Sequence, residues 1–570
     1  MNPTDASAAG VVAEALAWLA QDPDAETRAE LQQLIDEAGA GSEDAVAELH
    51  DRFDERLAFG TAGLRGQIAA GSNRMNRVLV SQAAAGLAAY LVARAVPGTA
   101  PSVVIGYDGR KNSRVFATDT AELMAGAGVR ATLLPRLLPT PVLAFAVRHL
   151  GTSAGVMVTA SHNPPDDNGY KVYLGGRDEG SQIVPPADAE IAEEILRVAA
   201  ELDVLELPRG SYETADEAVI EAYVAATAAV ASAPRSHVEV VYTAMHGVGW
   251  QTAQRVFRIA GFDDPHLVSA QIDPDPAFPT VAFPNPEEPG AMDLAFAAAR
   301  AVGAELVIAN DPDADRLAVA IPDAASTDGF RRLSGNEVGA LLGWRAAEQA
   351  AQQPGDGGPS GTLACSIVSS PALEAVATAY GLEFSDTLTG FKWVSRAPGL
   401  IYGYEEALGY LVNPETVRDK DGISAAVAFL SLASELKANG SSVAEHLDRF
   451  SETFGHFASS QISVRVTDLA RITTIMAALR ADPPAEIGGL RVDRIEDLSD
   501  GFGSLPPSDV LRIRLDDGAR VMVRPSGTEP KLKIYIDASS ATGSIAERKA
   551  AAIATVSQLE AGMRKLIGSE

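Results

Sequence analysis

Three aspartates, Asp311, Asp313 and Asp315, alternate directly after the apolar run 305–309. Three carboxylates this close repel one another, and a divalent cation that neutralises them makes the spacing tolerable. The run before them predicts a buried strand, and sites in open α/β sheets collect at strand ends. With only three carboxylates supplied, a bound Mg²⁺ would keep open positions for a substrate or a phosphate. A solvated acidic turn is the alternative.

A serine and a histidine occupy a second stretch, Thr-Ala-Ser-His-Asn-Pro at 159–164. The apolar run 154–158 before it predicts a buried strand, and Asn-Pro predicts a loop after it. Ser161 and His162 are therefore expected on an exposed turn just past a strand end. These residue types are also common in ordinary turns, so the hexapeptide alone leaves a turn and a site both open.

A third stretch combines hydroxyls, a glycine and a guanidinium after the predicted strand 520–523. Side-chain hydroxyls, backbone N–H groups of a Gly-containing turn and one arginine form a cradle for a phosphate. An ordinary hairpin loop is the alternative. The residues of this predicted cradle are Arg524, Ser526, Gly527 and Thr528, and Lys533 adds local positive charge.

Three further segments carry weaker signals. Residues 403–410 follow a predicted strand and offer carboxylate acceptors for sugar hydroxyls, although paired glutamates beside aromatic residues are common on surfaces. Lys420 stands between two aspartates at a helix start, which an ordinary cap with a salt bridge also explains. Arg65 lies between glycines, where little crowds a guanidinium that reaches for an anion.

Taken together, these motifs resemble the alpha-D-phosphohexomutase superfamily. The letters TASHNP, DPDADR, GYEEALGY and RPSGTEP stand in the superfamily's order, and the resemblance runs from Gly60 to about Asp537. Within the superfamily, the chain looks most like the phosphoglucomutase/phosphopentomutase branch. The segments that point there are GYDGRKNS (106–113), FPNPEE (283–288), LTGFKW (388–393) and RDKDG (418–422).

The resemblance implies a catalytic centre at Ser161, which matches the serine that carries the phosphoryl group. Asp311, Asp313 and Asp315 match the magnesium ligands, with the phosphoserine as the fourth protein contact. Arg65, His162 and Lys171 match positions around the phosphoserine, and Lys420 matches a lysine near the transferred group. His162 or Lys420 is the expected proton shuttle, and the sequence does not choose between them.

The resemblance also implies a sugar-phosphate site. The matched substrate-binding positions are Arg316, Thr389, Glu406, Arg524, Ser526, Gly527, Thr528 and Lys533. Many hexose-specific relatives carry a serine two residues after the sugar-loop glutamate, where this chain has Leu408. We therefore expect relaxed recognition of the distal sugar hydroxyls, which leaves glucose, mannose and pentose phosphates open as substrates.

The implied reaction is that of a phospho-sugar mutase with Mg²⁺ and glucose 1,6-bisphosphate as activator and intermediate. Glucose 1-phosphate and glucose 6-phosphate are the first expected pair, with pentose phosphates as further substrates. The alternatives are a phosphomannomutase, a glucose 1,6-bisphosphate synthase on the same scaffold, a silent sugar-phosphate-binding regulator and a phosphatase. The implied fold is four domains around a central cleft, with one functional loop per domain.

The elements that position these residues alternate between strand and helix. Apolar runs predict strands at 102–107, 130–134, 155–159, 238–243, 305–309, 317–321 and 362–368, with helical periodicity between them. This pattern indicates three α/β domains with mixed, largely parallel sheets, followed by a C-terminal α+β domain. The predicted domain limits are 1–214, including N-terminal helices, 215–330, 331–457 and 458–570.

Composition restricts the remaining classes. The chain has 570 residues, 46% of them hydrophobic, and a formal net charge of −30, which disfavours nucleic acid and anionic membranes as partners. A single cysteine excludes an internal disulfide, and the first residues carry no secretory signal, so we expect a cytoplasmic protein. Small-molecule sugar phosphates are the expected partners, and the sequence does not indicate an oligomeric state.

Overall fold

The protein is seen in a computed structural model that describes residues 3–60, 63–232, 234–352, 359–466, 469–503, 505–525 and 531–568. The chain divides into two compact units. One contains residues 1–331 together with 413–431, and the other contains 332–412 together with 432–570. Among the described residues, no helix is both long enough and apolar enough to cross a membrane.

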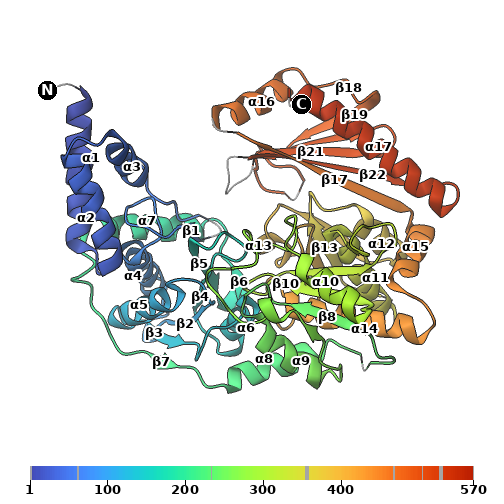
Figure 1. Cartoon of the computed structure of the whole chain (residues 1–570), viewed down its shortest axis with the longest axis horizontal. Helices are drawn as coiled ribbons and strands as arrows, with labels where there is room; N and C mark the ends of the chain where they lie inside the picture. Colours follow the sequence, from blue (N-terminus) through green and yellow to red (C-terminus); the bar gives the residue numbers. More distant parts are fainter. Residues whose placement is uncertain are drawn as a thin grey trace. The chain divides into compact units, whose positions relative to one another are not determined.

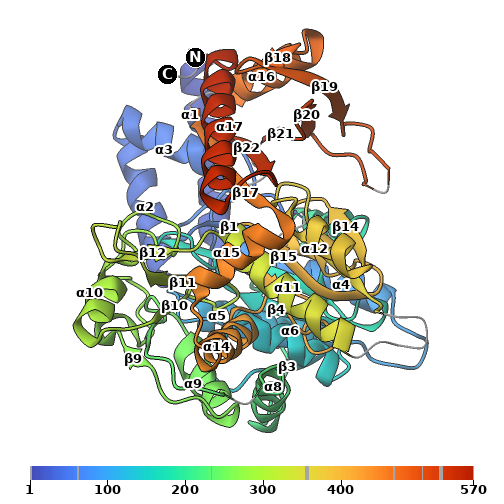
Figure 2. The same ribbon diagram turned by 90° about the vertical axis from the view of Figure 1, so that its right-hand side faces the viewer.

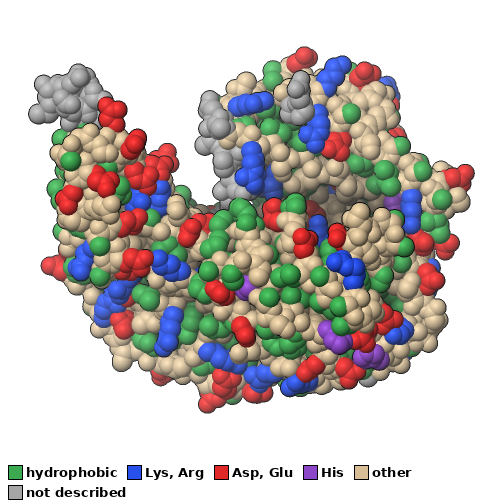
Figure 3. All heavy atoms as spheres, viewed as in Figure 1, with side chains coloured by type: hydrophobic (Ala, Val, Ile, Leu, Met, Phe, Trp, Pro, Cys, Tyr) green, Lys and Arg blue, Asp and Glu red, His purple; other side chains and the backbone are tan. Residues whose placement is uncertain are grey.

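Three helices precede the first sheet, in agreement with the predicted N-terminal helices. They are α1 (Pro3–Gln21), α2 (Ala25–Gly39) and α3 (Glu43–Phe53). Leu31, Leu49 and Phe53 pack in a small core between them. Acidic side chains gather over these helices in the space-filling view (Figure 3), so part of the excess negative charge of the chain lies on this segment.

The first sheet has the strand order β1-β5-β4-β2-β3-β7, with β6 paired to β5. β2, β3, β4 and β7 are parallel, whereas β5 runs antiparallel to both β4 and β1. The strands are β1 (Leu64–Gln67), β2 (Ser102–Tyr107), β3 (Arg130–Leu133), β4 (Ala154–Val158), β5 (Asp167–Leu174), β6 (Ser181–Gln182) and β7 (Glu213–Thr214). The helices are α4 (Arg77–Ala93), α5 (Ser113–Gly126), α6 (Thr140–His149) and α7 (Ala187–Glu201).

The second sheet has the order β12-β11-β10-β8-β9 and repeats the same plan. β8, β9 and β10 are parallel, and β11 returns antiparallel to β10. The strands are β8 (Val240–Thr243), β9 (His266–Leu267), β10 (Leu306–Asn310), β11 (Leu317–Pro322) and β12 (Phe330–Arg332). The helices are α8 (Ala218–Ala228), α9 (Gly249–Ile259) and α10 (Asp293–Val302).

The third sheet has the order β14-β13-β15-β16, with β16 antiparallel to β15. Its strands are β13 (Thr362–Ser366), β14 (Glu383–Thr387), β15 (Leu400–Glu405) and β16 (Gly409–Leu411). The helices of this part of the chain are α11 (Gly335–Gln352), α12 (Ala372–Tyr380), α13 (Phe391–Val394), α14 (Gly422–Ala438) and α15 (Val443–Phe454).

The C-terminal sheet is antiparallel throughout, in the order β17-β22-β21-β20-β19-β18. α17 (Ile545–Leu566) packs along β17 (His456–Arg465) and β22 (Lys531–Ser540), as Figures 1 and 2 show. The other elements are α16 (Leu469–Ala481), β18 (Glu486–Ile487), β19 (Leu490–Asp497), β20 (Leu511–Leu515) and β21 (Arg520–Pro525). The predicted fold, three α/β domains with mixed sheets and a C-terminal α+β domain, is confirmed.

The three α/β sheets place their functional motifs in equivalent connections. In each sheet, the motif joins a strand that has a parallel neighbour to the antiparallel strand beside it: β4 to β5, β10 to β11, and β15 to β16. Each connection contains one non-glycine residue with positive φ, namely Ser161 at +52°, Ala314 at +54° and Leu408 at +64°. A left-handed backbone at a non-glycine residue is costly, so the strands on either side must hold each bend in place.

Candidate active site

Ser161 lies three residues after Val158, the last residue of the buried strand β4, and begins the turn toward β5. Its amide donates to the Thr159 hydroxyl at 2.8 Å, which fixes the start of the turn. The prediction of an exposed turn was wrong, because only 2% of Ser161 is accessible. The burial comes from a tertiary contact, because Asp311 in the loop that joins β10 to β11 lies against the serine side chain.

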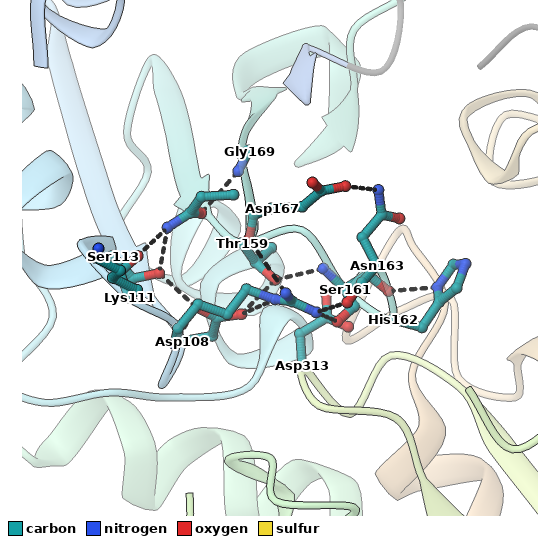
Figure 4. A network of polar contacts seen from close by, with 12 residues as sticks. Asp108, Lys111, Ser113, Thr159, Ser161, His162, Asn163, Asp167, Gly169 and Asp313 are labelled. Atoms are coloured by element: carbon teal, nitrogen blue, oxygen red, sulfur yellow. Dashed lines mark hydrogen bonds and ion pairs between the residues drawn. The ribbon is translucent and has the colours of Figure 1, made fainter. Parts of the chain in front are cut away.

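Arg110 holds the backbone of this turn. Its two Nη atoms donate to the carbonyl oxygens of Ser161 at 2.5 Å, Asn163 at 2.7 Å, Pro164 at 2.8 Å and Asp167 at 3.2 Å. A single guanidinium therefore satisfies four backbone acceptors of one loop. Figure 4 shows this network from close by, with Ser161, His162 and Asn163 at one end and Asp108 and Ser113 at the other.

Asp108 in turn fixes Arg110. The carboxylate lies 3.5 Å from Arg110 Nε and accepts hydrogen bonds from Ser113 Oγ at 2.6 Å and Thr159 Oγ1 at 2.7 Å. Both charged side chains are 1% exposed. A buried ion pair is tolerable when further hydrogen bonds satisfy most of its atoms. Here they reach both Asp108 carboxylate oxygens and both Arg110 Nη atoms, whereas Arg110 Nε has no hydrogen-bond partner among the described residues. The end of β2 thus positions the turn that follows β4.

The Ser161 hydroxyl lies between an acid and an imidazole. Its Oγ donates to Asp311 Oδ2 at 2.8 Å and is 3.2 Å from His162 Nδ1. Asp311 is fully buried and also accepts the Arg316 amide at 2.9 Å. The serine hydroxyl and the histidine of one predicted motif and the first aspartate of another therefore form one cluster.

The three aspartates of the β10–β11 connection converge as the sequence predicted. One carboxylate oxygen of each lies within 4.8 Å of the other two, and all three residues are buried. Oδ1 of Asp313 and Oδ1 of Asp315 are buried without a hydrogen-bond partner among the described residues. Buried carboxylate oxygens without partners are what a hard divalent cation would coordinate, so the donor set fits Mg²⁺.

Two lysines neutralise the same carboxylates. Lys171 Nζ donates to Asp313 Oδ2 at 2.8 Å and to Asp315 Oδ2 at 3.0 Å, and Lys420 Nζ lies 3.1 Å from that Asp315 oxygen. Thr140 Oγ1 adds a hydrogen bond to Asp313 Oδ2 at 2.7 Å. Lys171 comes from β5, directly beside the serine loop, so the first sheet contributes both the hydroxyl and a cation.

The pKa values of the clustered residues shift in different directions. Burial and the two neighbouring carboxylates raise the pKa of Asp311 well above its ordinary value. Burial alone would also raise the pKa of Asp313, but Lys171 outweighs it and holds that pKa low. Burial would lower the pKa of Lys171, and the two carboxylates reverse this shift and raise it. Lys171 is therefore a fixed cation.

The pKa of His162 shifts in the opposite direction from that of Lys171. Burial, followed by the charges of Arg316 and Arg65, lowers the pKa of His162 well below its ordinary value. Arg65 Nη1 donates to Asn163 Oδ1 at 3.1 Å, and Arg316 Nε lies 4.0 Å from both Asp311 and Asp315. The imidazole therefore stays neutral near neutral pH, in the form that can accept a proton.

The sugar-loop residues lie in the other compact unit. Glu406 follows β15 and accepts hydrogen bonds from Ser366 Oγ at 3.0 Å and Ser369 Oγ at 3.2 Å. The Thr389 loop is tied to the same hairpin, since the Gly390 amide donates to Glu405 Oε1 at 2.7 Å. The segment 403–410 does not simply follow a strand, because it forms most of a β-hairpin.

Arg524 and Lys533 are directly opposite each other on the antiparallel pair β21–β22. Two like charges in facing positions destabilise a strand pair unless an anion offsets them. Burial and the carboxylates of Glu406 and Glu405 raise the pKa of Tyr535, and Arg524 opposes that shift, so all three charges act on this one tyrosine. Ser526, Gly527 and Thr528 lie outside the described residues.

Arg110, Asp108 and Thr140 were not among the predicted site residues. Asp108 and Arg110 directly follow β2, which is parallel to β4, so both loops leave the same edge of the sheet. That placement is the signal that could have identified them. Thr140 begins α6, and its contact with Asp313 spans 173 positions, which no local pattern reveals.

The chain matches four models of one family in order. They are Phosphoglucomutase/phosphomannomutase alpha/beta/alpha domain I at residues 56–201, domain II at 221–324, domain III at 334–453, and the C-terminal domain at 462–556. The three helices α1 to α3 precede the first match.

Individual relatives agree with the family models. A Haemophilus influenzae protein named "Probable phosphomannomutase" is 52% identical over 494 residues, covering 86% of this chain and 98% of that protein. The Mus musculus phosphopentomutase is 35% identical over 575 residues, covering 93% of this chain and 90% of that protein. The crystal structure of a phosphoglucomutase/phosphomannomutase family protein from Burkholderia thailandensis shares the fold, with a TM-score of 0.67 at 21% identity over 90% of this chain and 97% of that one. Since four consecutive family models and relatives along most of the length agree, the chain belongs to the phosphoglucomutase/phosphomannomutase family of phosphomutases.

Proposed function

We propose that this protein interconverts glucose 1-phosphate and glucose 6-phosphate, with pentose phosphates as further substrates. The observation that supports it most is the setting of Ser161. Its hydroxyl lies 2.8 Å from Asp311 in a chain of net charge −30, yet Lys171, Lys420 and Arg316 surround the same aspartates. Cations concentrated on the carboxylates of the cluster that contacts this buried hydroxyl suit a covalently held, doubly charged phosphoryl group.

In the proposed cycle, Ser161 carries a phosphoryl group on Oγ. The bond between Oγ and phosphorus breaks, a hydroxyl of the sugar monophosphate forms the new bond to phosphorus, and that hydroxyl loses its proton. The bisphosphorylated sugar, glucose 1,6-bisphosphate for the glucose pair, then reorients and returns its other phosphoryl group to Ser161. Such a transfer depends mainly on positioning and charge neutralisation.

The chain's own residues supply both requirements. Arg110 fixes the Ser161 backbone, and Lys171, held cationic by Asp313 and Asp315, offsets charge on the moving group. His162 is neutral and 3.2 Å from Oγ, which supports it as the group that takes the proton of the sugar hydroxyl. Arg65 and Lys420 add positive charge beside the serine and the aspartates.

Mg²⁺ held by Asp311, Asp313, Asp315 and the phosphorylated Ser161 would supply Lewis-acid stabilisation of the phosphoryl oxygens. The unpartnered oxygens of Asp313 and Asp315 support this assignment. For the non-transferring phosphate, we propose Arg524, Ser526, Gly527, Thr528 and Lys533 as the binding group. For the sugar, we propose Arg316, Thr389 and Glu406, and the two serine hydroxyls on Glu406 support a fixed acceptor.

The domain limits 1–214, 215–330, 331–457 and 458–570 are part of the same proposal. Each limit falls in a gap between consecutive family-model matches, at 201–221, 324–334 and 453–462. In this scheme the first two domains contribute the phosphoserine loop and the metal loop, and the last two contribute the sugar loop and the phosphate loop.

A phosphomannomutase is the second candidate, because the 52% identical relative carries that name. One series of assays separates the two. Purified protein is supplied with Mg²⁺, glucose 1,6-bisphosphate and, in turn, glucose, mannose, ribose or deoxyribose 1-phosphate, and kcat/KM is compared. Glucose as the best substrate with measurable pentose turnover supports the proposal, whereas mannose as the best substrate replaces it with the second candidate.

A labelling experiment tests the covalent step. Incubation with glucose 1,6-bisphosphate that carries labelled phosphorus should label Ser161 in the wild type and leave Ser161→Ala unlabelled and without mutase activity. Label on another residue, or turnover by Ser161→Ala, contradicts the role given to this serine.

A further inference from the structure

Lys420 stands between two buried carboxylates, and each of them is held by a buried tyrosine. Tyr173 OH donates to Asp419 Oδ2 at 2.9 Å, and Tyr223 OH lies 3.0 Å from both carboxylate oxygens of Asp421. Asp419 is 1% exposed, and Asp421 and both tyrosines are fully buried. Tyr173 comes from β5, a strand of the first sheet, and Tyr223 comes from α8, a helix that accompanies the second sheet.

Asp419 fixes the backbone of the lysine itself. Its Oδ1 accepts the Lys420 amide at 2.8 Å, while its Oδ2 also accepts Gln182 Nε2 at 2.8 Å. Both oxygens of a buried carboxylate are thereby occupied. An ordinary surface cap needs no such set of donors, because water would satisfy the carboxylate.

Asp421 fixes the other side of the lysine. Its Oδ1 accepts the amides of Ile423 and Ser424 at 3.0 Å each, in the first turn of α14, which begins two residues after the lysine. Gly422, which follows Asp421, donates its amide to Ala314 O at 3.2 Å in the loop that joins β10 to β11. A Cβ at Gly422 would lie 2.2 Å from Arg316 O, so the backbone approaches that loop as closely as it can.

The result of both attachments is the placement of one ammonium group. Lys420 Nζ lies 3.1 Å from Asp315 Oδ2, the oxygen that Lys171 also reaches. A lysine has a flexible four-carbon stem, so its ammonium is held in one position only if the backbone beneath it is fixed and its surroundings are close. The Lys420 side chain is 13% exposed, which meets the second condition.

We propose that Tyr173–Asp419 and Tyr223–Asp421 form a double clip whose function is to position Lys420 at the phosphoryl-transfer site. The four clip residues are positioning residues, since they act through Lys420. The inference rests on the proposed function, in which Lys420 adds charge near the transferred group. A purely structural role for the same bonds predicts loss of stability without a specific effect on turnover.

A double-mutant cycle separates these two roles. Tyr173→Phe and Tyr223→Phe each remove one hydroxyl and keep the ring. We expect each to lower kcat about tenfold with KM for glucose 1-phosphate within about twofold of wild type, because the loss falls on the transition state. In the Lys420→Ala background, the same changes should lower kcat no further, since residues that act as one unit are not additive.

The controls match the chemistry of the change. Tyr402→Phe removes another buried tyrosine hydroxyl, which donates to Gly339 O at 2.9 Å, and should leave kcat unchanged. If Tyr173→Phe does not fold, Gln182→Met removes a second donor to the same Asp419 oxygen from a partly exposed position and takes its place in the cycle.

Each outcome decides the matter. Coupling to Lys420 supports the clip, whereas equal losses of kcat in the wild-type and Lys420→Ala backgrounds, or unchanged kcat in both Phe variants, overturn it. Lys420→Ala with wild-type kcat also overturns it. A wild-type enzyme that turns over no sugar phosphate contradicts the proposed function instead, so the two failures are distinct.

Discussion

Arg110 Nη2 donates to the backbone oxygen of Ser161 at 2.5 Å, so the residue proposed as nucleophile is held through its own carbonyl group. Three more carbonyls of the same loop accept from this guanidinium. The backbone of Ser161 is thereby fixed without any use of its hydroxyl, which donates to Asp311 instead.

Arg110→Lys should lower kcat by about 100-fold with little change in KM, because a displacement of about 1 Å at a reacting atom costs that much. Lysine keeps the charge but lacks the planar fork that reaches four acceptors. Steady-state kinetics on glucose 1-phosphate measure the effect. Arg209→Lys is the control, since Arg209 is a partly exposed arginine paired with Asp119 and Glu122, and it should remain near wild type. Unchanged kcat in Arg110→Lys contradicts this prediction.

Asp313→Asn should abolish the stabilisation of the protein by Mg²⁺. A cation that binds only the folded state at 100 times its Kd stabilises it by about 2.7 kcal/mol, and the substitution removes one of the three converging carboxylates. Thermal unfolding with and without MgCl₂ gives the shift in Tm independently of activity. The exposed Asp328→Asn serves as the control and should keep the wild-type shift. If Asp313→Asn keeps that shift, the triplet is not the metal site.

Leu408→Ser should raise the preference for hexose over pentose phosphates by about 1 kcal/mol, the contribution of one hydrogen bond. The substitution should also destabilise the fold. Leu408 is fully buried at φ +64°, and truncating a buried leucine lowers the free energy of unfolding by about 2–5 kcal/mol. Leu408→Ala is therefore the matched control, because it makes the same cavity without a hydroxyl. The ratio of kcat/KM for glucose and ribose 1-phosphates should change in the serine variant and not in the alanine variant. Equal ratios in the two variants would show that the serine hydroxyl does not determine the specificity.

His446 should make the stability of its unit depend on pH. The imidazole stacks on Trp344 with ring centroids 4.5 Å apart, and burial, then Arg449 and Arg345, lower its pKa to about 4. In the unfolded chain the pKa is about 6.5, so between these values only the unfolded state is protonated and stability falls as the pH falls. Between pH 7 and pH 5 this loss amounts to about 2 kcal/mol.

His446→Phe keeps a ring beside Trp344 and removes the titration. Urea unfolding followed by tryptophan fluorescence at pH 7 and pH 5 should therefore show a smaller pH dependence in the variant, by that amount. Parallel losses of stability in the two proteins would show that other groups carry the pH dependence.

The strongly patterned elements could be predicted from the sequence. Ser102–Tyr107 forms a strand with the predicted bounds, because a continuous apolar run depends only on neighbouring residues. β5 (Asp167–Leu174) was not predicted, because Asn168, Lys171 and Tyr173 interrupt its apolar pattern. These polar groups are buried because each finds a partner that the local sequence does not contain.

The candidate site could likewise be predicted from the sequence only in part. The convergence of Ser161, Lys171 and the aspartates was implied by motif resemblance, but the burial of Ser161 was not, since Asp311, 150 positions later, lies against it. Arg110 was read as part of a branch-specific segment without a role, because four bonds to backbone carbonyls leave no trace in the identity of the residues that accept them.

The three left-handed residues at 161, 314 and 408 are a serine, an alanine and a leucine, and none is a glycine. The conformation of each connection is therefore dictated by the pairing of the strands that flank it rather than by a permissive residue at the bend. Scaffold and reactivity are separable in such an arrangement. The strand pairs supply the energy that the bend costs, so the residue types in the connection can vary to give a nucleophile, cation ligands or a sugar acceptor.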